Sequence, residues 1–258
     1  MPYLLFVALC ALSLFLGMVR LLEAGRRLGL RRRAHDAEGA AAGGRVVEGA
    51  VFGLLGLLVA FTFSGAAARF DIRRQLIVEE TNAIGTAYLR LDLLPPAAQP
   101  ALRGRFRQYV EARLAAYRQL PDIVAAQAEE RRATQMQGDI WRQAVAACQE
   151  AGVPHATMLL LPALNAMLDI TTTRTLATRM HPPTIIFGMR FGLALASALL
   201  AGYGMAGTPS HRWLHMLAFA AVIAAVVYVM LDLEYPRLGL IRFQAFDQAL
   251  VELRQSMQ

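Results

Sequence analysis

The chain has 258 residues, of which 56% are hydrophobic and 17% are charged. Globular domains contain about 45–50% apolar and about 25% charged residues, so this composition excludes a disordered chain and argues against a soluble enzyme. The formal net charge is +7, and all 26 basic residues are arginine. Because a basic chain binds nucleic acid only where the charge covers a soluble face, we expect no nucleic-acid partner. Two cysteines cannot form a disulfide framework.

Four apolar stretches have the length of membrane-spanning helices. They run from about 2 to 22, 46 to 68, 184 to 206 and 212 to 232. A bilayer core about 30 Å thick requires about 20 such residues, and core helices of soluble proteins seldom run so long without a polar face. In the first stretch the positive charge follows the apolar run, which favours a retained span over a cleaved signal peptide. The sequence therefore predicts a multi-pass membrane protein.

The connection between the first two spans is rich in arginine. Its basic residues, together with those at its two edges, are Arg20, Arg26, Arg27, Arg31, Arg32, Arg33 and Arg45. Short connections rich in arginine stay in the cytoplasm, and contact with anionic lipid headgroups explains this basic stretch better than nucleic acid does. Both chain ends and the long region 69–182 are then predicted to be extracytoplasmic.

The second span carries a stripe of small residues and a separate stripe of bulky ones. The small stripe is Gly49, Gly53, Gly56, Ala60 and Ser64, and Gly188 and Gly192 repeat the glycine spacing on the third span. Such stripes let helix backbones approach in lipid, so they predict helix packing within a subunit or between subunits. Phe52, Val59 and Phe63 share another face, and rings of apolar side chains can gate a pore. These three residues are our pore-lining candidates.

Arg190 is the charge that lies furthest from the ends of a predicted span. Arg190 is about seven residues into the third apolar stretch. Its side chain can reach the membrane surface, or it can form a buried pair with Glu48, Asp71 or Asp232. The sequence leaves both arrangements open.

The long region has a helical pattern. Phe70, Ile77, Ile84 and Leu91 repeat at intervals of seven, an apolar seam that we expect charged residues to flank. These charged residues are Arg73, Arg74, Glu79, Glu80 and Arg90. No breaker separates the second span from the seam, so one helix should continue as far as the Pro95-Pro96 pair.

Three more helices are predicted in the insert, at about 98–120, from Pro121-Asp122 to Gly152, and through Leu161 towards Met180. The fold class is therefore all-α: four transmembrane helices with a helical extramembrane bundle inserted between spans two and three. The expected domains are a hairpin over 1–68, the extramembrane domain over 69–182, a second hairpin over 183–232 and a C-terminal amphipathic helix within 233–258. The chain has no phosphate-binding loop, nucleophile elbow or zinc motif, so we expect no enzyme, catalytic residue, metal or cofactor.

This order of segments resembles the bestrophin-like family of bacterial membrane proteins. The resemblance rests on Glu48-Gly49, Leu58-Val59-Ala60-Phe61, the segment from Arg69 to Ala83, Asn165 and Asp169, and Asp232-x-Glu234-x-Pro236-x-x-Gly239. It implies a four-span helical subunit in the bacterial inner membrane. Through remoter likeness to bestrophins it also implies an oligomeric anion channel, with an apolar neck that Phe52, Val59 and Phe63 could form. Bestrophins keep the insert in the cytoplasm, whereas the arginine-rich connection predicts the opposite side for 69–182.

Two functions follow from these expectations. The first is a homo-oligomeric, channel-like protein that conducts anions through a pore between subunits, lined by the second span, with Arg69 and Arg73 attracting the anion at its mouth. The alternative is a membrane scaffold whose helical extramembrane domain binds a partner without transport. In both, the lipid bilayer is a partner of the chain.

Overall fold

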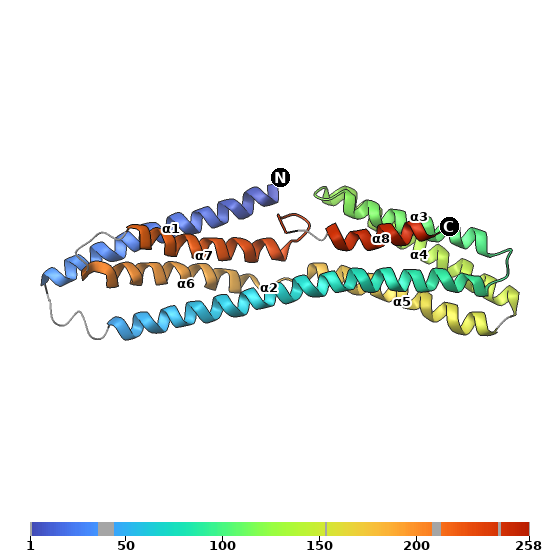
Figure 1. Cartoon of the computed structure of the whole chain (residues 1–258), viewed down its shortest axis with the longest axis horizontal. Coiled ribbons are helices and arrows are strands. Elements are labelled where there is room, and N and C mark those ends of the chain that lie inside the picture. The colour runs from blue at the N-terminus through green and yellow to red at the C-terminus, as the bar shows by residue number, and fades with distance from the viewer. Residues whose placement is uncertain (1, 36–43, 153, 208–212, 242–243, 258) are drawn as a thin grey trace. The chain divides into compact units, whose positions relative to one another are not determined.

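The computed structural model describes residues 2–35, 44–152, 154–207, 213–241 and 244–257, and all regular structure among them is helical. The α-helices are α1 (Pro2–His35), α2 (Gly44–Leu89), α3 (Gln99–Arg118), α4 (Ile123–Ala151), α5 (Pro154–Arg179), α6 (Thr184–Gly204), α7 (Trp213–Glu234) and α8 (Gln244–Ser256), with 3₁₀ turns η1 (Arg90–Leu93) and η2 (Met205–Gly207) (Figure 1). Four stretches are long and apolar enough to cross a membrane: Tyr3–Ala34, Val46–Leu93, Pro154–Gly204 and Trp213–Glu234. The described residues therefore form a helical structure with four stretches suited to a multi-pass membrane protein.

The chain divides into two compact units. The first contains Met1–Ala68 and His181–Leu240, and the second contains Arg69–Met180 and Ile241–Gln258. Helix α2 contributes to both, because it runs unbroken from Gly44 to Leu89. This confirms the predicted continuation of the second span into the heptad seam.

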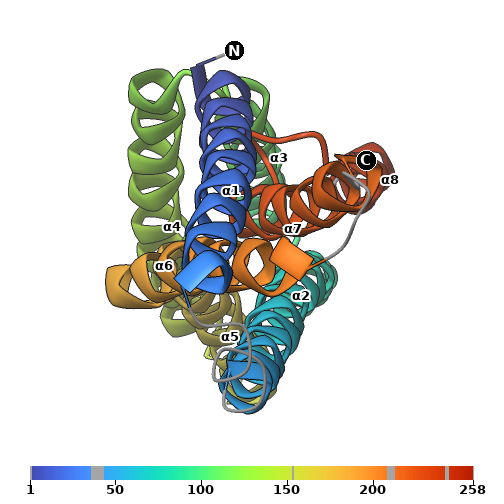
Figure 2. The same ribbon diagram turned by 90° about the vertical axis from the view of Figure 1, so that its left-hand side faces the viewer.

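In the first unit, α1 packs along both α6 and α7. Its core includes Met18 and Leu22 of α1, Ala194 of α6, and Met216 and Ala220 of α7. Figures 1 and 2 show α1 and α2 on opposite sides of α6 and α7. Within this unit α2 is therefore a peripheral helix.

Helix α1 is longer than the predicted span, because the arginine-rich stretch expected as a connection is helical as far as His35. The reason lies at two glycines of this stretch. A Cβ on Gly25 would lie 2.0 Å from the carbonyl oxygen of Leu199, and a Cβ on Gly29 would lie 2.7 Å from that of Tyr203. The absence of side chains lets α1 stay against the backbone of α6, and this packing supports the additional helical turns. Gly202 makes the reciprocal approach, since its Cβ would lie 1.9 Å from the oxygen of Leu22.

A tight turn follows α7 in the first unit. Both carboxylate oxygens of Asp232 accept from the backbone N–H of Leu240, at 2.9 and 3.1 Å. A Cβ on Gly239 would lie 1.9 Å from one of these oxygens, so the Asp-to-Gly spacing of this motif is a steric requirement. Next to it, the ring of His181 stacks on that of Tyr235, with the ring centroids 4.5 Å apart. The Nδ1 atom of His181 lies 3.4 Å from a carboxylate oxygen of Glu234.

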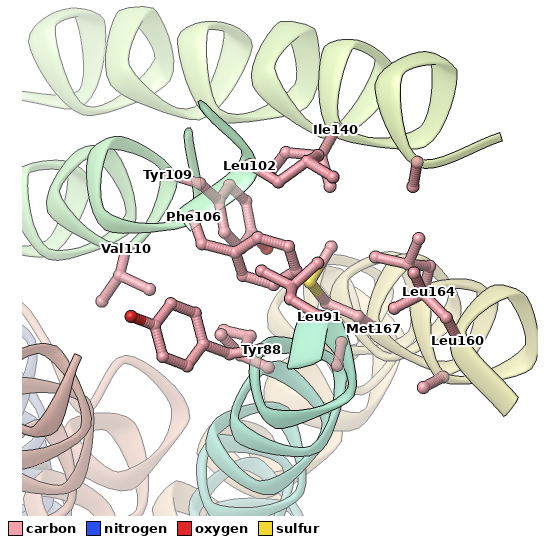
Figure 3. Packing of buried hydrophobic residues seen from close by; sticks show 14 of the residues in the cluster. Tyr88, Leu91, Leu102, Phe106, Tyr109, Val110, Ile140, Leu160, Leu164 and Met167 are labelled. Atoms are coloured by element: carbon pink, nitrogen blue, oxygen red, sulfur yellow. The ribbon is translucent and has the colours of Figure 1, made fainter. Parts of the chain in front are cut away.

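The second unit is built from the C-terminal part of α2, η1, α3, α4, α5 and α8. Figure 3 shows Phe106 and Tyr109 of α3 among apolar side chains of the surrounding helices, including Leu91 and Met167. Of the four heptad residues, Ile77, Ile84 and Leu91 are buried, as expected for a seam, and Phe70 is half-buried. Leu250 of α8 belongs to the same core. The described part of the segment 233–258, which was predicted to be one C-terminal amphipathic helix, contains the end of α7, the turn that follows it and α8.

Local sequence signals explain the ends of α4. The carboxylate of Asp122 accepts from the N–H of Ala125 at 3.0 Å, which caps the N-terminus. Gly152 has φ +59°, the left-handed conformation that ends a helix and favours glycine.

Candidate functional site

Helix α2 meets the rest of the first unit along one face. Leu55 and Ala66 are buried on this face. The ring of Phe52 lies edge-on to Phe219 of α7 at 6.0 Å, and the hydroxyl of Thr62 donates to the sulfur of Met230 at 3.4 Å. The contact is therefore mainly with α7.

The three pore-lining candidates differ in their surroundings. Phe52 contacts α7, and Val59 packs at the edge of the first unit's core. Phe63 is 42% exposed. Within one subunit, these three bulky residues therefore lie at the boundary between the contact with α7 and the open face of α2. Phe52 and Val59 are half-buried, and Phe63 is exposed.

The stripe of small residues lies on the open face of α2. A Cβ on Gly49, Gly53 or Gly56 would meet nothing within 4 Å, and Ala60 and Ser64 are exposed. Gly188 and Gly192 of α6 are equally open. Within the part of the chain that the structure describes, the five glycines thus face open space and Ala60 and Ser64 are exposed, and the packing role of all seven positions remains a prediction for contacts between subunits.

Beyond the apolar part of α2, two charged residues lie on the seam that they were expected to flank, so that expectation was wrong. Arg73 and Glu80 are both buried. Each follows a seam residue by three positions, after Phe70 and Ile77, and residues so spaced share a helix face. A charged residue at such a position is the sequence signal for a buried partner.

Arg73 caps the C-terminal end of α5. It is 5% exposed, its Nε donates to the carbonyl oxygen of Ala177 at 3.1 Å, and its Nη2 donates to that of Met180 at 2.8 Å. Carbonyls at a helix C-terminus lack partners within the helix and carry partial negative charge. The guanidinium is thus engaged with backbone groups, whereas Arg69, one turn earlier, is half-buried.

Glu80 joins three helices through a buried ion network. One carboxylate oxygen accepts from the Nε of Arg113 of α3 at 2.7 Å, and the other accepts from Arg174 of α5. The hydroxyl of Tyr117 accepts from Arg113 at 2.7 Å, and the guanidinium of Arg174 lies 4.4 Å above the Tyr117 ring. Burial acts to lower the pKa of Arg113, but Tyr117 and Glu80 raise it above its ordinary value, so the guanidinium stays charged.

A second buried polar group lies beside this network. The amide nitrogen of Gln137 donates to the hydroxyl of Tyr109 and to that of Thr171, each at 3.0 Å. Burial raises the pKa of Tyr109 to about 12, so this hydroxyl is neutral at physiological pH. The Glu80 network and the Gln137 group therefore have hydrogen-bond partners inside the second unit, as is typical of buried polar groups that specify one packing arrangement.

Arg190 is buried in the first unit, at 2% exposure, with its guanidinium 5.1 Å from the centre of the Phe187 ring. The sequence left open whether this side chain reaches the membrane surface or is buried inside the protein. Its burial favours the second arrangement. Elsewhere, the exposed Asn165 and Asp169 form a hydrogen bond of 3.4 Å along α5.

The sequence matches the family model of the Bestrophin-like domain over residues 28–244. Among solved structures, the fold is similar to that of a bacterial bestrophin homologue from Klebsiella pneumoniae carrying a tyrosine-to-alanine mutation, with a TM-score of 0.66, 12% identity, and coverage of 93% of this chain and 98% of the other. No curated protein matches the sequence. The matched region extends from the arginine-rich part of α1 to the first residue of α8, and the chain therefore belongs to the bestrophin-like family.

Proposed function

We propose that the protein is a homo-oligomeric, channel-like membrane protein that conducts anions between its subunits, with α2 lining the passage. The observation that carries this proposal is the exposure of α2. In an apolar segment of 18 residues, only 6% of α2 is buried, whereas 33% of the corresponding segment of α7 is buried. A helix covered so little within its own subunit has most of its surface free for lipid or for a neighbouring subunit.

The open face of α2 suits a close neighbour. Nothing lies within 4 Å of the Cβ positions of Gly49, Gly53 and Gly56, so the backbone of another helix can approach there, which is how helices associate in lipid. Phe63 lies beside this face. In a ring of subunits, Phe63 side chains can meet around an axis and form an apolar constriction that opens and closes by wetting.

Charge supports an anion as the conducted species. Arg69 follows the apolar part of α2 directly, which places a positive group at the end of the proposed passage. Since Arg73 holds the end of α5, Arg69 is the stronger candidate of the two for attracting an anion.

The packing of the first unit supports the proposed four-span topology. Gly17 of α1 approaches Leu195 of α6, and Gly29 approaches Ala206, so the two helices run in the same direction, as spans one and three must. The arginines at the end of α1 favour the cytoplasm for that end. We therefore propose a bacterial inner-membrane location with 69–182 as an extracytoplasmic domain.

Chloride efflux from liposomes tests this function. The purified wild-type protein should release trapped chloride, and Phe63→Ala should increase the rate by widening the constriction. The matched control is Phe61→Ala, because Phe61 is 69% exposed on the open face away from the proposed constriction. We expect this variant to behave as wild type.

Mass photometry of the same samples should show a closed homo-oligomer. Absence of chloride efflux from an intact oligomer would overturn the channel proposal. Co-purification of a second protein with subunits that conduct nothing would favour the scaffold.

A further inference from the structure

The first unit contains a groove between α1 and α6. Its cavity has a volume of about 470 Å³, within the range of pockets that hold small organic ligands. Gly25, Leu28, Leu199, Leu200 and Tyr203 line it. Because Gly25 has no side chain, the backbones of α1 and α6 touch there, at two of the residues that line the groove, Gly25 and Leu199.

Two arginines complete the lining of this groove, Arg31 and Arg32. They follow Leu28 by three and four positions, so all three share one face of α1. This arrangement exists because α1 continues as a helix to His35. A flexible connection would not hold the two guanidinium groups beside an apolar wall.

The lining changes character along the length of α1 and α6. Leu199 and Leu200 are deeper in the third span, Tyr203 is near its end, and Arg31 and Arg32 lie beyond the apolar part of α1. The parallel direction of α1 and α6 keeps this order on both walls. A ligand that fits must therefore be apolar at the deep end and anionic at the membrane surface.

We infer that this groove binds one anionic phospholipid, with its phosphate at Arg31 and Arg32 and an acyl chain against Leu28, Leu199 and Leu200. A small anion would not contact the leucine wall, and a neutral apolar molecule would offer no negative charge to the two guanidinium groups. The tyrosine ring at the level between them is typical of the membrane interface. This inference is independent of the proposed conduction of anions.

Native mass spectrometry of the full-length protein tests this inference with dioleoyl-phosphatidylglycerol as the probe and dioleoyl-phosphatidylcholine as the zwitterionic comparison. The wild type should retain one phosphatidylglycerol per subunit in preference to phosphatidylcholine. Arg31→Gln with Arg32→Gln should weaken this retention about 30-fold, since each arginine near an anionic surface contributes roughly fivefold. Leu28→Trp, which fills the groove and keeps both charges, should also reduce it.

The matched control is Arg27→Gln with Arg33→Gln. It removes two charges from the same helix that do not line the groove, where Arg27 bonds to Glu23 at 2.7 Å, and it should leave retention close to that of the wild type. Equal loss in the two double variants would overturn the inference in favour of general attraction to the membrane surface. Unchanged retention in Leu28→Trp would overturn it as well.

Discussion

The two units of this protein hold their helices together in different ways. In the first, α1 and α6 are joined by backbone contact at Gly25 and Gly202. In the second, the helices are separated by large side chains such as Phe106 and Tyr109 and tied by the buried network of Glu80. Lipid offers no gain for burying one apolar side chain against another, so spans depend on close approach, whereas amphipathic helices gain from burying aromatic side chains away from water.

The comparison also separates two sets of glycines that look alike in the sequence. Gly25 and Gly29 are four residues apart, as are Gly49 and Gly53 and also Gly188 and Gly192. Gly25 and Gly29 are in contact with the α6 segment, whereas a Cβ on any of the other four would meet no described atom within 4 Å. The spacing permits close packing, and the neighbouring helix decides whether it occurs.

Removal of the central carboxylate should break the second unit most severely. We expect Glu80→Ala to lower the free energy of unfolding by about 3–5 kcal/mol, because two buried guanidinium groups lose their counter-charge. The matched control is Glu79→Ala, at an exposed neighbour whose carboxylate accepts a local hydrogen bond from Gln75, and it should cost less than about 0.5 kcal/mol. Chemical denaturation of the detergent-solubilised protein, followed by circular dichroism, measures both. Similar losses in the two variants would show that the network does not stabilise this unit.

In the first unit the corresponding change is Gly202→Ala. The added Cβ would meet the backbone of Leu22, which cannot move aside as a side-chain end can, and we expect a loss of about 3 kcal/mol. Gly104→Ala inside α3 meets open space and should be neutral or stabilising within about 1 kcal/mol, since alanine favours helix. The unfolding midpoints of the two variants provide the test. A tolerated alanine at 202 would mean that backbone contact does not hold α1 against α6.

The smallest of the three effects should come from Arg73→Gln, with a loss of about 2 kcal/mol for the hydrogen bonds to the end of α5. Chloride flux per folded oligomer should be unchanged. Arg69→Gln should do the reverse, lowering flux without a comparable loss of stability. Parallel unfolding and liposome assays separate the two roles, and a flux defect confined to Arg73→Gln would reverse our assignment.

Much of the fold could be predicted because its signals are local. The lengths of the apolar stretches predict the spans, Pro95-Pro96 marks the end of the long helix, and Asp122 and Gly152 bound α4. The heptad spacing also predicts the buried seam of Ile77, Ile84 and Leu91. Each of these features depends on residues close together in the sequence, so composition and spacing alone determine them.

The tertiary structure decided what those local signals could not. It brings Arg113 and Arg174 to Glu80, it directs Arg73 to the end of α5, and it places α6 against Gly25. All of these contacts join residues far apart in the chain, and a charge or a glycine carries no record of its distant partner. The sequence by itself determined a helical chain with four stretches long and apolar enough to cross a membrane. The packing of distant helices decided which of its charges are buried and which of its small-residue faces remain open.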